Sequence, residues 1–257
     1  MYFGGHAPGQ IEPINGLEMY YEVRGDGEPL VLLHGFLGSG TDWRLIFKAP
    51  PEGYRLVIPD LRGHGRSTNP SGEFTFRQSG ADVFALLDRL DIARFKAIGV
   101  SGGAKTLLHM ATQQPARIEA MVLVSATLYF PEQARAIMRQ MTVESRTDEE
   151  WQMMRQRHQH GDDQIRALWR LANAFKDSYD DMNFTPHDLS RITARTLIVH
   201  GDRDPFYPVS IALEMYTAIP RSYLWIVPNG GHGPIWGDMA PRFVETASAF
   251  LRGEWGG

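Results

Sequence analysis

Short runs of consecutive apolar residues recur along this chain and are separated by segments of helical periodicity. Such runs are typical of parallel strands that are buried on both faces of a sheet. They predict strands over Leu30–Leu33, Tyr54–Pro59, Phe95–Val100, Ala120–Ser125 and Thr196–His200, with a further strand over Ser222–Pro228. Partial alternation of apolar and polar residues over Leu17–Arg24 instead predicts an antiparallel strand near an edge of the sheet.

The segments between these strands carry apolar residues at helical spacing. They predict helices over Phe74–Leu90, Ser101–Gln113, Val209–Ala218 and Ala240–Leu251. Strands that alternate with helices indicate an α/β fold, in which helices cover both faces of a parallel sheet.

One long segment, from about Leu128 to about Arg191, breaks this alternation. It is rich in helix-favouring residues, and Leu168, Trp169, Leu171, Ala172 and Phe175 fall on one face of a helix. The segment is too long for a plain crossover. We expect a core made of residues 1–127 and 192–257, with residues 128–191 forming a helical cap over the carboxyl ends of the strands, where open α/β sheets bind ligands. A helical pair packed on a flank is the alternative.

Composition excludes several classes of function. The chain has 257 residues, 22% of them charged, a net charge of −4 and no cysteine, so disulfides and thiolate catalysis are absent. Lysine and arginine are scattered, so we expect no nucleic-acid partner. No apolar run approaches the ~20 residues of a membrane span. Met1–Gln10 shows no secretory signal, and a cytoplasmic location is expected.

The stretch Gly99-Val100-Ser101-Gly102-Gly103 has the pattern G-x-S-x-G between a predicted strand and a predicted helix. A serine at such a sharp turn is held in a strained backbone conformation with its hydroxyl exposed. Gly99 and Gly103 are expected to avoid Cβ clashes where strand and helix meet. The pattern in this context predicts a nucleophilic serine.

A serine hydroxyl needs a base beside it and a carboxylate to orient that base. Two carboxylates, Asp202 and Asp204, follow the strand that ends at His200, and His232 lies in a glycine-rich loop after the last strand. The order serine, aspartate, histidine is the one found on α/β-hydrolase sheets.

Together with these residues, two more motifs give the chain a resemblance to serine-dependent α/β hydrolases over nearly its whole length. His34-Gly35-Phe36 is similar to the family's oxyanion loop, and Asp60-Leu61-Arg62-Gly63-His64-Gly65-Arg66-Ser67 to its D-x-R-G-x-G-x-S turn. The resemblance implies an eight-stranded, mostly parallel sheet flanked by helices, with a helical cap insertion.

The resemblance also implies roles for individual residues. Ser101 is the expected nucleophile, His232 the general base, and Asp204 the triad acid, with Asp202 as its competitor. The backbone N–H groups of Phe36 and Gly102 are the expected oxyanion hole. Neither a cofactor nor a metal is expected.

Three aromatic side chains, Phe130, Trp169 and Trp236, are candidates to line the substrate pocket. His34, His64 and His200 are expected to be structural. His158 and His160 are expected at a solvated helix end rather than at a metal, because residues two apart do not share a helical face.

The predicted activity is hydrolysis of carboxylic esters of small to medium size and broad range through an acyl-enzyme. Met138, Met141, Met153 and Met154 in the cap would accommodate varied ligand shapes. C–C bond hydrolysis, lactonase, thioesterase and perhydrolase activity use the same triad and remain alternatives. A small-ligand signalling receptor with residual hydrolysis is an alternative of another class, with the acidic tract Thr147–Glu150 as a partner surface or simply a solvated helix start. Monomer and homodimer are both open.

Overall fold

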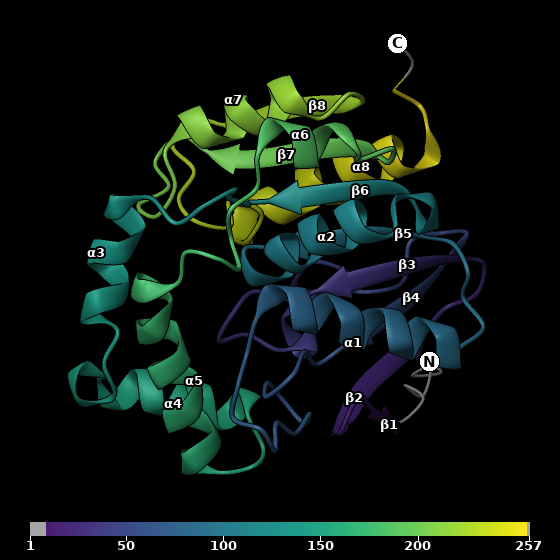
Figure 1. Cartoon of the computed structure of the whole chain (residues 1–257). Helices are drawn as coiled ribbons and strands as arrows, with labels where there is room; N and C mark the ends of the chain where they lie inside the picture. The colour runs from purple at the N-terminus through teal and green to yellow at the C-terminus, as the bar shows by residue number, and fades with distance from the viewer. Residues whose placement is uncertain (1–8, 256–257) are drawn as a thin grey trace.

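Eight strands form one sheet in the order β1-β2-β4-β3-β5-β6-β7-β8 (Figure 1). The computed structural model describes residues 9–255, so most of the segment Met1–Gln10, where no signal was predicted, lies outside it. The strands are β1 (Gln10–Ile14), β2 (Leu17–Arg24), β3 (Glu28–Leu33), β4 (Tyr54–Pro59), β5 (Phe95–Val100), β6 (Ile118–Val124), β7 (Arg195–Gly201) and β8 (Ser222–Val227). From β4 to β8 all neighbours are parallel, whereas β1 and β2 are antiparallel to theirs.

The predicted strands are confirmed to within a few residues, but β1 was missed. Its sequence, Gln-Ile-Glu-Pro-Ile, places polar residues and a proline in an exposed edge strand, so it has neither an apolar run nor clean alternation. The antiparallel strand β2 therefore lies one position in from the edge.

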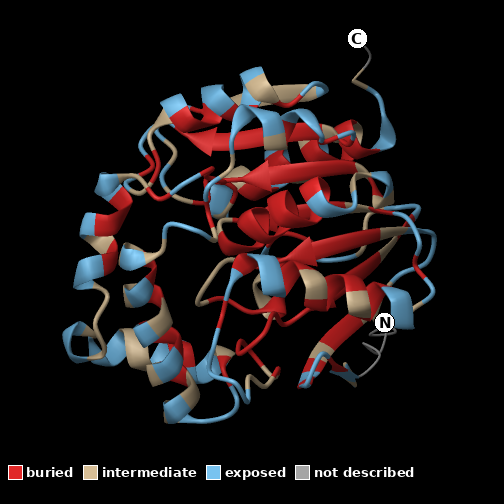
Figure 2. Ribbon diagram, in the orientation of Figure 1, coloured by how far each residue is buried: buried red, intermediate tan, exposed pale blue. Residues whose placement is uncertain are grey.

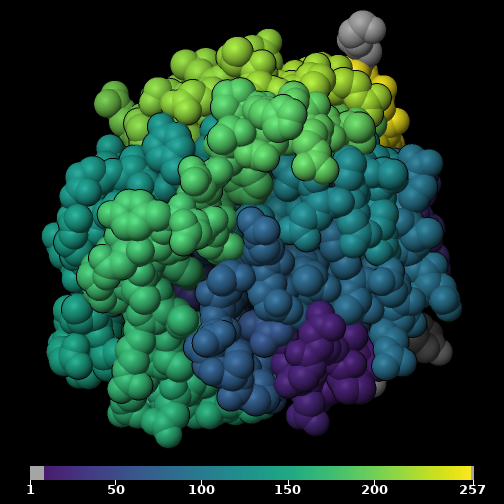
Figure 3. All heavy atoms as spheres, in the orientation of Figure 1, coloured from purple at the N-terminus to yellow at the C-terminus, as the bar shows by residue number. Residues whose placement is uncertain are grey.

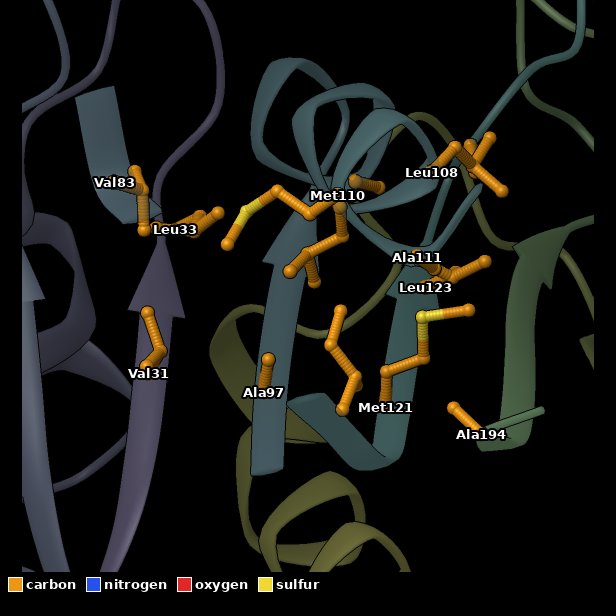
Figure 4. Close-up of a cluster of buried hydrophobic side chains, with 14 of the residues drawn as sticks. Val31, Leu33, Val83, Ala97, Leu108, Met110, Ala111, Met121, Leu123 and Ala194 are labelled. Carbon is orange, nitrogen blue, oxygen red and sulfur yellow. The ribbon is translucent and has the colours of Figure 1, made fainter. Parts of the chain in front are cut away.

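Helices pack on both faces of the sheet. On one face α1 (Phe76–Arg89), α2 (Gly102–Gln113) and α7 (Val209–Ala218) bury apolar side chains against the sheet, and on the other α8 (Ala240–Arg252) does so. Figure 2 shows that the central strands are buried along most of their length. Figure 4 shows Leu108, Met110 and Ala111 of α2 gathered with side chains of the neighbouring strands. Successive side chains along each central strand point to opposite faces of the sheet, so each strand contributes residues to the hydrophobic clusters on both faces.

The segment between β6 and β7 is helical, and its first three helices stand beside the carboxyl ends of the strands (Figure 1). They are α3 (Glu132–Gln140), α4 (Asp148–Arg157) and α5 (Asp162–Ala174); we call them the cap helices. The short helix α6 (Pro186–Ser190) differs, because Leu189 packs in the sheet-side cluster. Figure 3 shows the green end of this segment against the blue start of α1, where the Asp181 carboxylate accepts the Phe76 N–H at 2.6 Å.

The acidic tract Thr147–Glu150 begins α4. Thr147 Oγ1 accepts the N–H of Glu150, and the Glu150 carboxylate accepts the N–H of Thr147, which forms a capping box. The acids of this first helical turn also suit the helix dipole. The tract therefore has a local structural role. No helix within residues 9–255 has the length and apolar character needed to cross a bilayer.

A buried ion pair anchors the turn between β4 and α1 to the helix. Arg62 Nε and one Nη lie 2.8 and 2.9 Å from the two oxygens of Asp82, whose side chain is fully buried. Asn15 and Gln78 also donate to Asp82, so both carboxylate oxygens of Asp82 accept hydrogen bonds. The pair holds the D-x-R-G-x-G-x-S turn in place.

Replacing Asp82 by asparagine is expected to lower the free energy of unfolding by about 3–5 kcal/mol, because the Arg62 charge stays buried without a counter-charge. Urea unfolding at pH 7 measures this loss. Asp88→Asn is the matched control on the same helix: it breaks a pair with Arg117 in which the aspartate is 66% exposed, and about 0–1 kcal/mol is expected. Equal losses in the two variants would contradict the role given to the buried pair.

Candidate active site

Ser101 lies at the sharp turn between β5 and α2. Its φ is +48° and its ψ −101°, a conformation rare for a residue with a side chain. A Cβ on Gly99 would lie 2.6 Å from the carbonyl carbon of Gly103, and one on Gly103 would meet the Leu33 carbonyl oxygen. The glycines of the motif are therefore required by the close approach of strand and helix, as the sequence predicted.

Three side chains from distant loops form one hydrogen-bonded chain. His232 Nε2 lies 2.8 Å from Ser101 Oγ, and His232 Nδ1 lies 2.8 Å from Asp204 Oδ2. The ring of His232 packs against the aromatic rings of Phe206 and Tyr207, with centroid distances of 4.8 and 5.4 Å. Gly233, next in the chain, donates its N–H to Ser125 Oγ at 2.9 Å, which fixes the loop on β6.

Asp204 is a buried carboxylate with every oxygen engaged. Its Oδ1 accepts the N–H groups of Phe206 at 2.8 Å and Tyr207 at 3.1 Å, while Oδ2 faces His232. Burial acts to raise the pKa of Asp204, but the hydrogen bond and charge of His232 and the two N–H groups outweigh it and hold the pKa below its ordinary value. Asp202, the competing residue, is exposed, and Asp204 is the residue that meets the histidine.

The loop after β3 brings a second backbone N–H close to Ser101. A Cβ on Gly102 would lie 2.6 Å from the Phe36 nitrogen, so the two backbones are nearly in contact. Leu37 has a φ of +68°, and Gly38 donates to the Gly35 carbonyl at 2.9 Å. Within the described residues, neither the Phe36 nor the Gly102 N–H donates to another group. Both N–H groups remain available to an oxyanion beside Ser101.

Three buried histidines hold the loops around Ser101 by hydrogen bonds to the backbone. His34 Nδ1 donates to the Gly35 carbonyl at 2.8 Å, and its Nε2 accepts the Leu61 N–H at 2.9 Å. His64 donates to the Arg62 carbonyl, and His200 Nε2 to that of Tyr207. Burial lowers the pKa of His34 and of His64. These contacts are structural, as predicted for all three histidines.

His158 corrects a prediction. It follows α4 but is buried rather than solvated, with 2% exposure. Its Nδ1 accepts the Gly65 N–H at 2.9 Å, and its Nε2 lies 3.2 Å from the Leu37 carbonyl. The cap is thereby bonded to the oxyanion loop, a contact between residues too far apart in sequence for spacing to reveal. Within residues 9–255 no three His, Asp or Glu side chains are grouped to hold a metal ion.

Acidification is expected to weaken this contact. Burial, aided by the charges of His34 and Arg157, lowers the pKa of His158 from about 6.5 to about 4. The unfolded chain therefore takes up this proton first, so the stability is present above about pH 6.5 and is lost as the pH falls toward 4. Between pH 7 and 4.5 the loss from His158 is about 2–3 kcal/mol.

Urea unfolding at both pH values measures this loss. His158→Gln keeps an acceptor and a donor without a titrating ring, and it should reduce the pH dependence. His187→Gln, which replaces an exposed histidine on α6, should leave it unchanged. An unaltered pH dependence in His158→Gln would refute the assignment.

A cavity of ≈ 430 Å³ opens at Ser101 and His232. Trp236 lines it, as predicted, but Phe130 and Trp169 do not, and these two expectations are corrected. Phe130 stacks on Phe175 with ring centroids 5.8 Å apart, and it is buried in a hydrophobic cluster next to the cavity. Trp169 is buried among the cap helices, where the Arg146 guanidinium lies 4.6 Å from its ring.

Several lining residues were not predicted as pocket residues. Phe206 and Tyr207 lie two and three residues after Asp204, and Lys105 lies four residues after Ser101, one helical turn away. All three residues could have been predicted, because Phe206 and Tyr207 share a loop with Asp204 and Lys105 shares a helix face with Ser101. Of the four cap methionines, Met138 and Met141 line the cavity, whereas Met154 is packed among the cap helices and Met153 is exposed.

A strained serine between strand and helix, a histidine and a buried carboxylate at the carboxyl ends of a mostly parallel sheet define the arrangement of an α/β hydrolase. The family model of the alpha/beta hydrolase fold matches residues 28–189. The chain belongs to the alpha/beta hydrolase fold family.

Similar proteins include several hydrolases. The chain is 28% identical to the human serine hydrolase BPHL over 258 residues, covering 97% of this chain and 88% of the relative. It is 30% identical to the non-heme chloroperoxidase of Burkholderia pyrrocinia over 253 residues, covering 85% and 91%. The enol-lactonase of Burkholderia xenovorans LB400 has a similar fold, with a TM-score of 0.77, 22% identity and coverage of 95% and 100%.

Proposed function

We propose that this hydrolase cleaves carboxylic esters by a serine acyl-enzyme mechanism, with Ser101 as nucleophile, His232 as base and Asp204 as the orienting acid. The observation that carries the proposal is the continuous chain from Ser101 Oγ through His232 to Asp204, with both links at 2.8 Å. Such a chain makes a neutral hydroxyl nucleophilic at neutral pH.

In the first half of the reaction Ser101 Oγ attacks the ester carbonyl carbon, and its proton passes to His232 Nε2. The carbonyl oxygen becomes an oxyanion and accepts the N–H groups of Phe36 and Gly102. One such donor lowers the barrier by about 3 kcal/mol. Asp204 stabilises the imidazolium that forms. The tetrahedral intermediate collapses, the C–O bond to the alcohol breaks, and His232 returns its proton to the leaving oxygen.

In the second half water attacks the acyl-enzyme. His232 takes a proton from the water, the oxyanion forms again in the same place, and the bond to Ser101 Oγ breaks as that oxygen regains its proton. The products are the carboxylic acid and the free enzyme, so every atom is accounted for without a cofactor.

The cavity supports small to medium esters of broad range. Its volume of ≈ 430 Å³ lies at the lower end of the range for ligand pockets. Met138 and Met141 form part of its wall, and thioether side chains adapt to different shapes.

The test is hydrolysis of p-nitrophenyl esters from acetate to long chains, followed by labelling with a fluorophosphonate. We expect many turnovers per protein, a preference for short and medium chains, and one adduct on the peptide that carries Ser101. A single slow event per molecule would instead favour the signalling receptor. Absence of both turnover and adduct would refute the proposal.

A further inference from the structure

We propose that the cavity contains a binding site for a carboxylate at Lys105, so that the preferred substrates are esters that also carry a free carboxylate group. This inference rests on the proposed function and narrows its substrate class. It comes from a buried cation in the wall of the cavity that the acyl-enzyme mechanism does not use.

Lys105 is fixed close to the reacting serine. Its backbone N–H donates to the Ser101 carbonyl at 3.0 Å, which makes it the residue one turn along α2 on the same helix face. It lines the same cavity as Ser101 and His232, yet its exposure is only 3%. Lys105 is therefore part of the wall of the substrate cavity and not of the outer surface.

The ammonium group has no carboxylate partner among the described residues. Its one hydrogen bond is to Tyr207 Oη at 3.0 Å, and it lies 4.7 and 5.0 Å from the ring centres of Phe76 and Phe130. The nearest acids are already engaged: Asp204 by His232 and two N–H groups, and Asp181 by the N–H groups of Phe76 and Arg77. Neither forms a salt bridge with Lys105.

The other cation of the cavity is neutralised. Arg157 Nε lies 3.2 Å from Asp42 Oδ1, and both residues line the cavity. Among the lining residues that the structure describes, Lys105 is thus the one lysine or arginine that forms no salt bridge with a carboxylate. An arriving carboxylate would find its counter-charge there.

Tyr207 adds a second donor to the site. Burial raises the pKa of Tyr207, so the phenol stays protonated. Its oxygen accepts from Lys105, and its own O–H has no acceptor within residues 9–255. Two ammonium hydrogens and one phenolic hydrogen therefore remain for an anionic oxygen, which suits a carboxylate.

Burying an ammonium group without a carboxylate partner lowers the stability of the folded protein. A residue needed only for packing would not require this charge, whereas a residue that binds an anionic ligand would. Burial lowers the pKa of Lys105 to about 7 in spite of Asp181 and Asp204. The folded state therefore binds this proton less tightly than the unfolded chain, and below about pH 10 the lysine lowers stability. Methionine, with a similar length and no charge, would fill the space without that cost.

The test compares matched esters with the wild-type protein. One pair is monomethyl glutarate and the ester in which isopropyl replaces its free carboxylate, which places the charge on the acyl side. The second pair is the acetyl ester of γ-hydroxybutyrate and its isopropyl counterpart, which places the charge on the alcohol side. We expect kcat/KM to favour the anionic ester by about ten- to a hundredfold in one pair. The pair that shows this preference identifies the side on which Lys105 lies.

Lys105→Met should abolish that preference while hydrolysis of the neutral esters persists, and its melting temperature should rise. Tyr207→Phe should reduce the preference by a smaller factor. Lys48→Met is the matched control, since it removes an exposed lysine outside this cavity. A lysine that served only packing would give a lower melting temperature and no change in ester preference.

Binding of the non-hydrolysed glutaramate, compared with its isopropyl counterpart, provides a readout that needs no turnover. Tighter binding of glutaramate that is lost in Lys105→Met supports the inference even if ester hydrolysis fails. Turnover of neutral esters with no anionic preference and no effect of Lys105→Met would overturn the inference and leave the proposed function standing.

Discussion

Replacing Ser101 by alanine is expected to lower kcat for a p-nitrophenyl ester by about 10⁶-fold. In the proposed mechanism this variant removes the oxygen that forms the acyl-enzyme, so His232 and the proposed oxyanion donors are left with water as the only nucleophile. Rates are measured at saturating ester, with the loss of fluorophosphonate labelling as a second readout.

The melting temperature of Ser101→Ala controls for misfolding. Ser101 adopts its φ of +48° because β5 and α2 meet there, and alanine must adopt the same conformation. We therefore expect no large fall in stability. A folded variant that retains more than about one-hundredth of the activity would exclude Ser101 as the nucleophile, since loss of a triad serine removes far more.

Replacing Asp204 by asparagine is expected to lower kcat by about 10⁴-fold with little change in substrate affinity. An asparagine that directs its NH₂ group at His232 would favour the imidazole tautomer with the proton on Nε2, and that nitrogen then cannot accept the proton of Ser101. The two N–H groups of Phe206 and Tyr207 keep the side-chain oxygen in place, so the geometry should persist.

Asp202→Asn is the matched control. It lies two residues away in the same loop, is exposed and does not contact the histidine. We expect its activity to stay within a factor of about two, as for surface substitutions away from such contacts. A large loss in Asp202→Asn together with a mild one in Asp204→Asn would exchange the roles of the two acids.

The sequence allowed the sheet and the serine turn to be predicted because both depend on local patterns. Runs such as Leu30–Leu33 must be buried on both faces, and Gly99 and Gly103 are needed wherever strand and helix touch. The exposed strand β1 was not predicted, because it is extended through its pairing with β2 and its own composition is not typical of a strand.

The pocket was harder to predict because it is made by contacts between distant segments. Phe130 and Trp169 have the composition of pocket residues, yet neighbouring aromatic and cap side chains cover them. His158 is polar and ends a helix, which predicts solvent exposure, but the Gly65 N–H and the Leu37 carbonyl lie around it. Spacing within one segment cannot reveal such a partner.

The contacts of His158 also mean that the cap is not an independent cover. His158 bonds to Leu37, the residue next to Phe36, whose N–H is the proposed oxyanion donor. It also bonds to Gly65, in the turn whose Asp60 accepts the Gly40 N–H at 2.7 Å. Gln164 adds hydrogen bonds to the carbonyls of Gly63 and Gly65. A protein shortened by deletion of the cap helices would therefore not be a more accessible form of the same catalyst. It would lose a support of its own oxyanion loop, so substrate access and transition-state stabilisation are not separately adjustable in this chain.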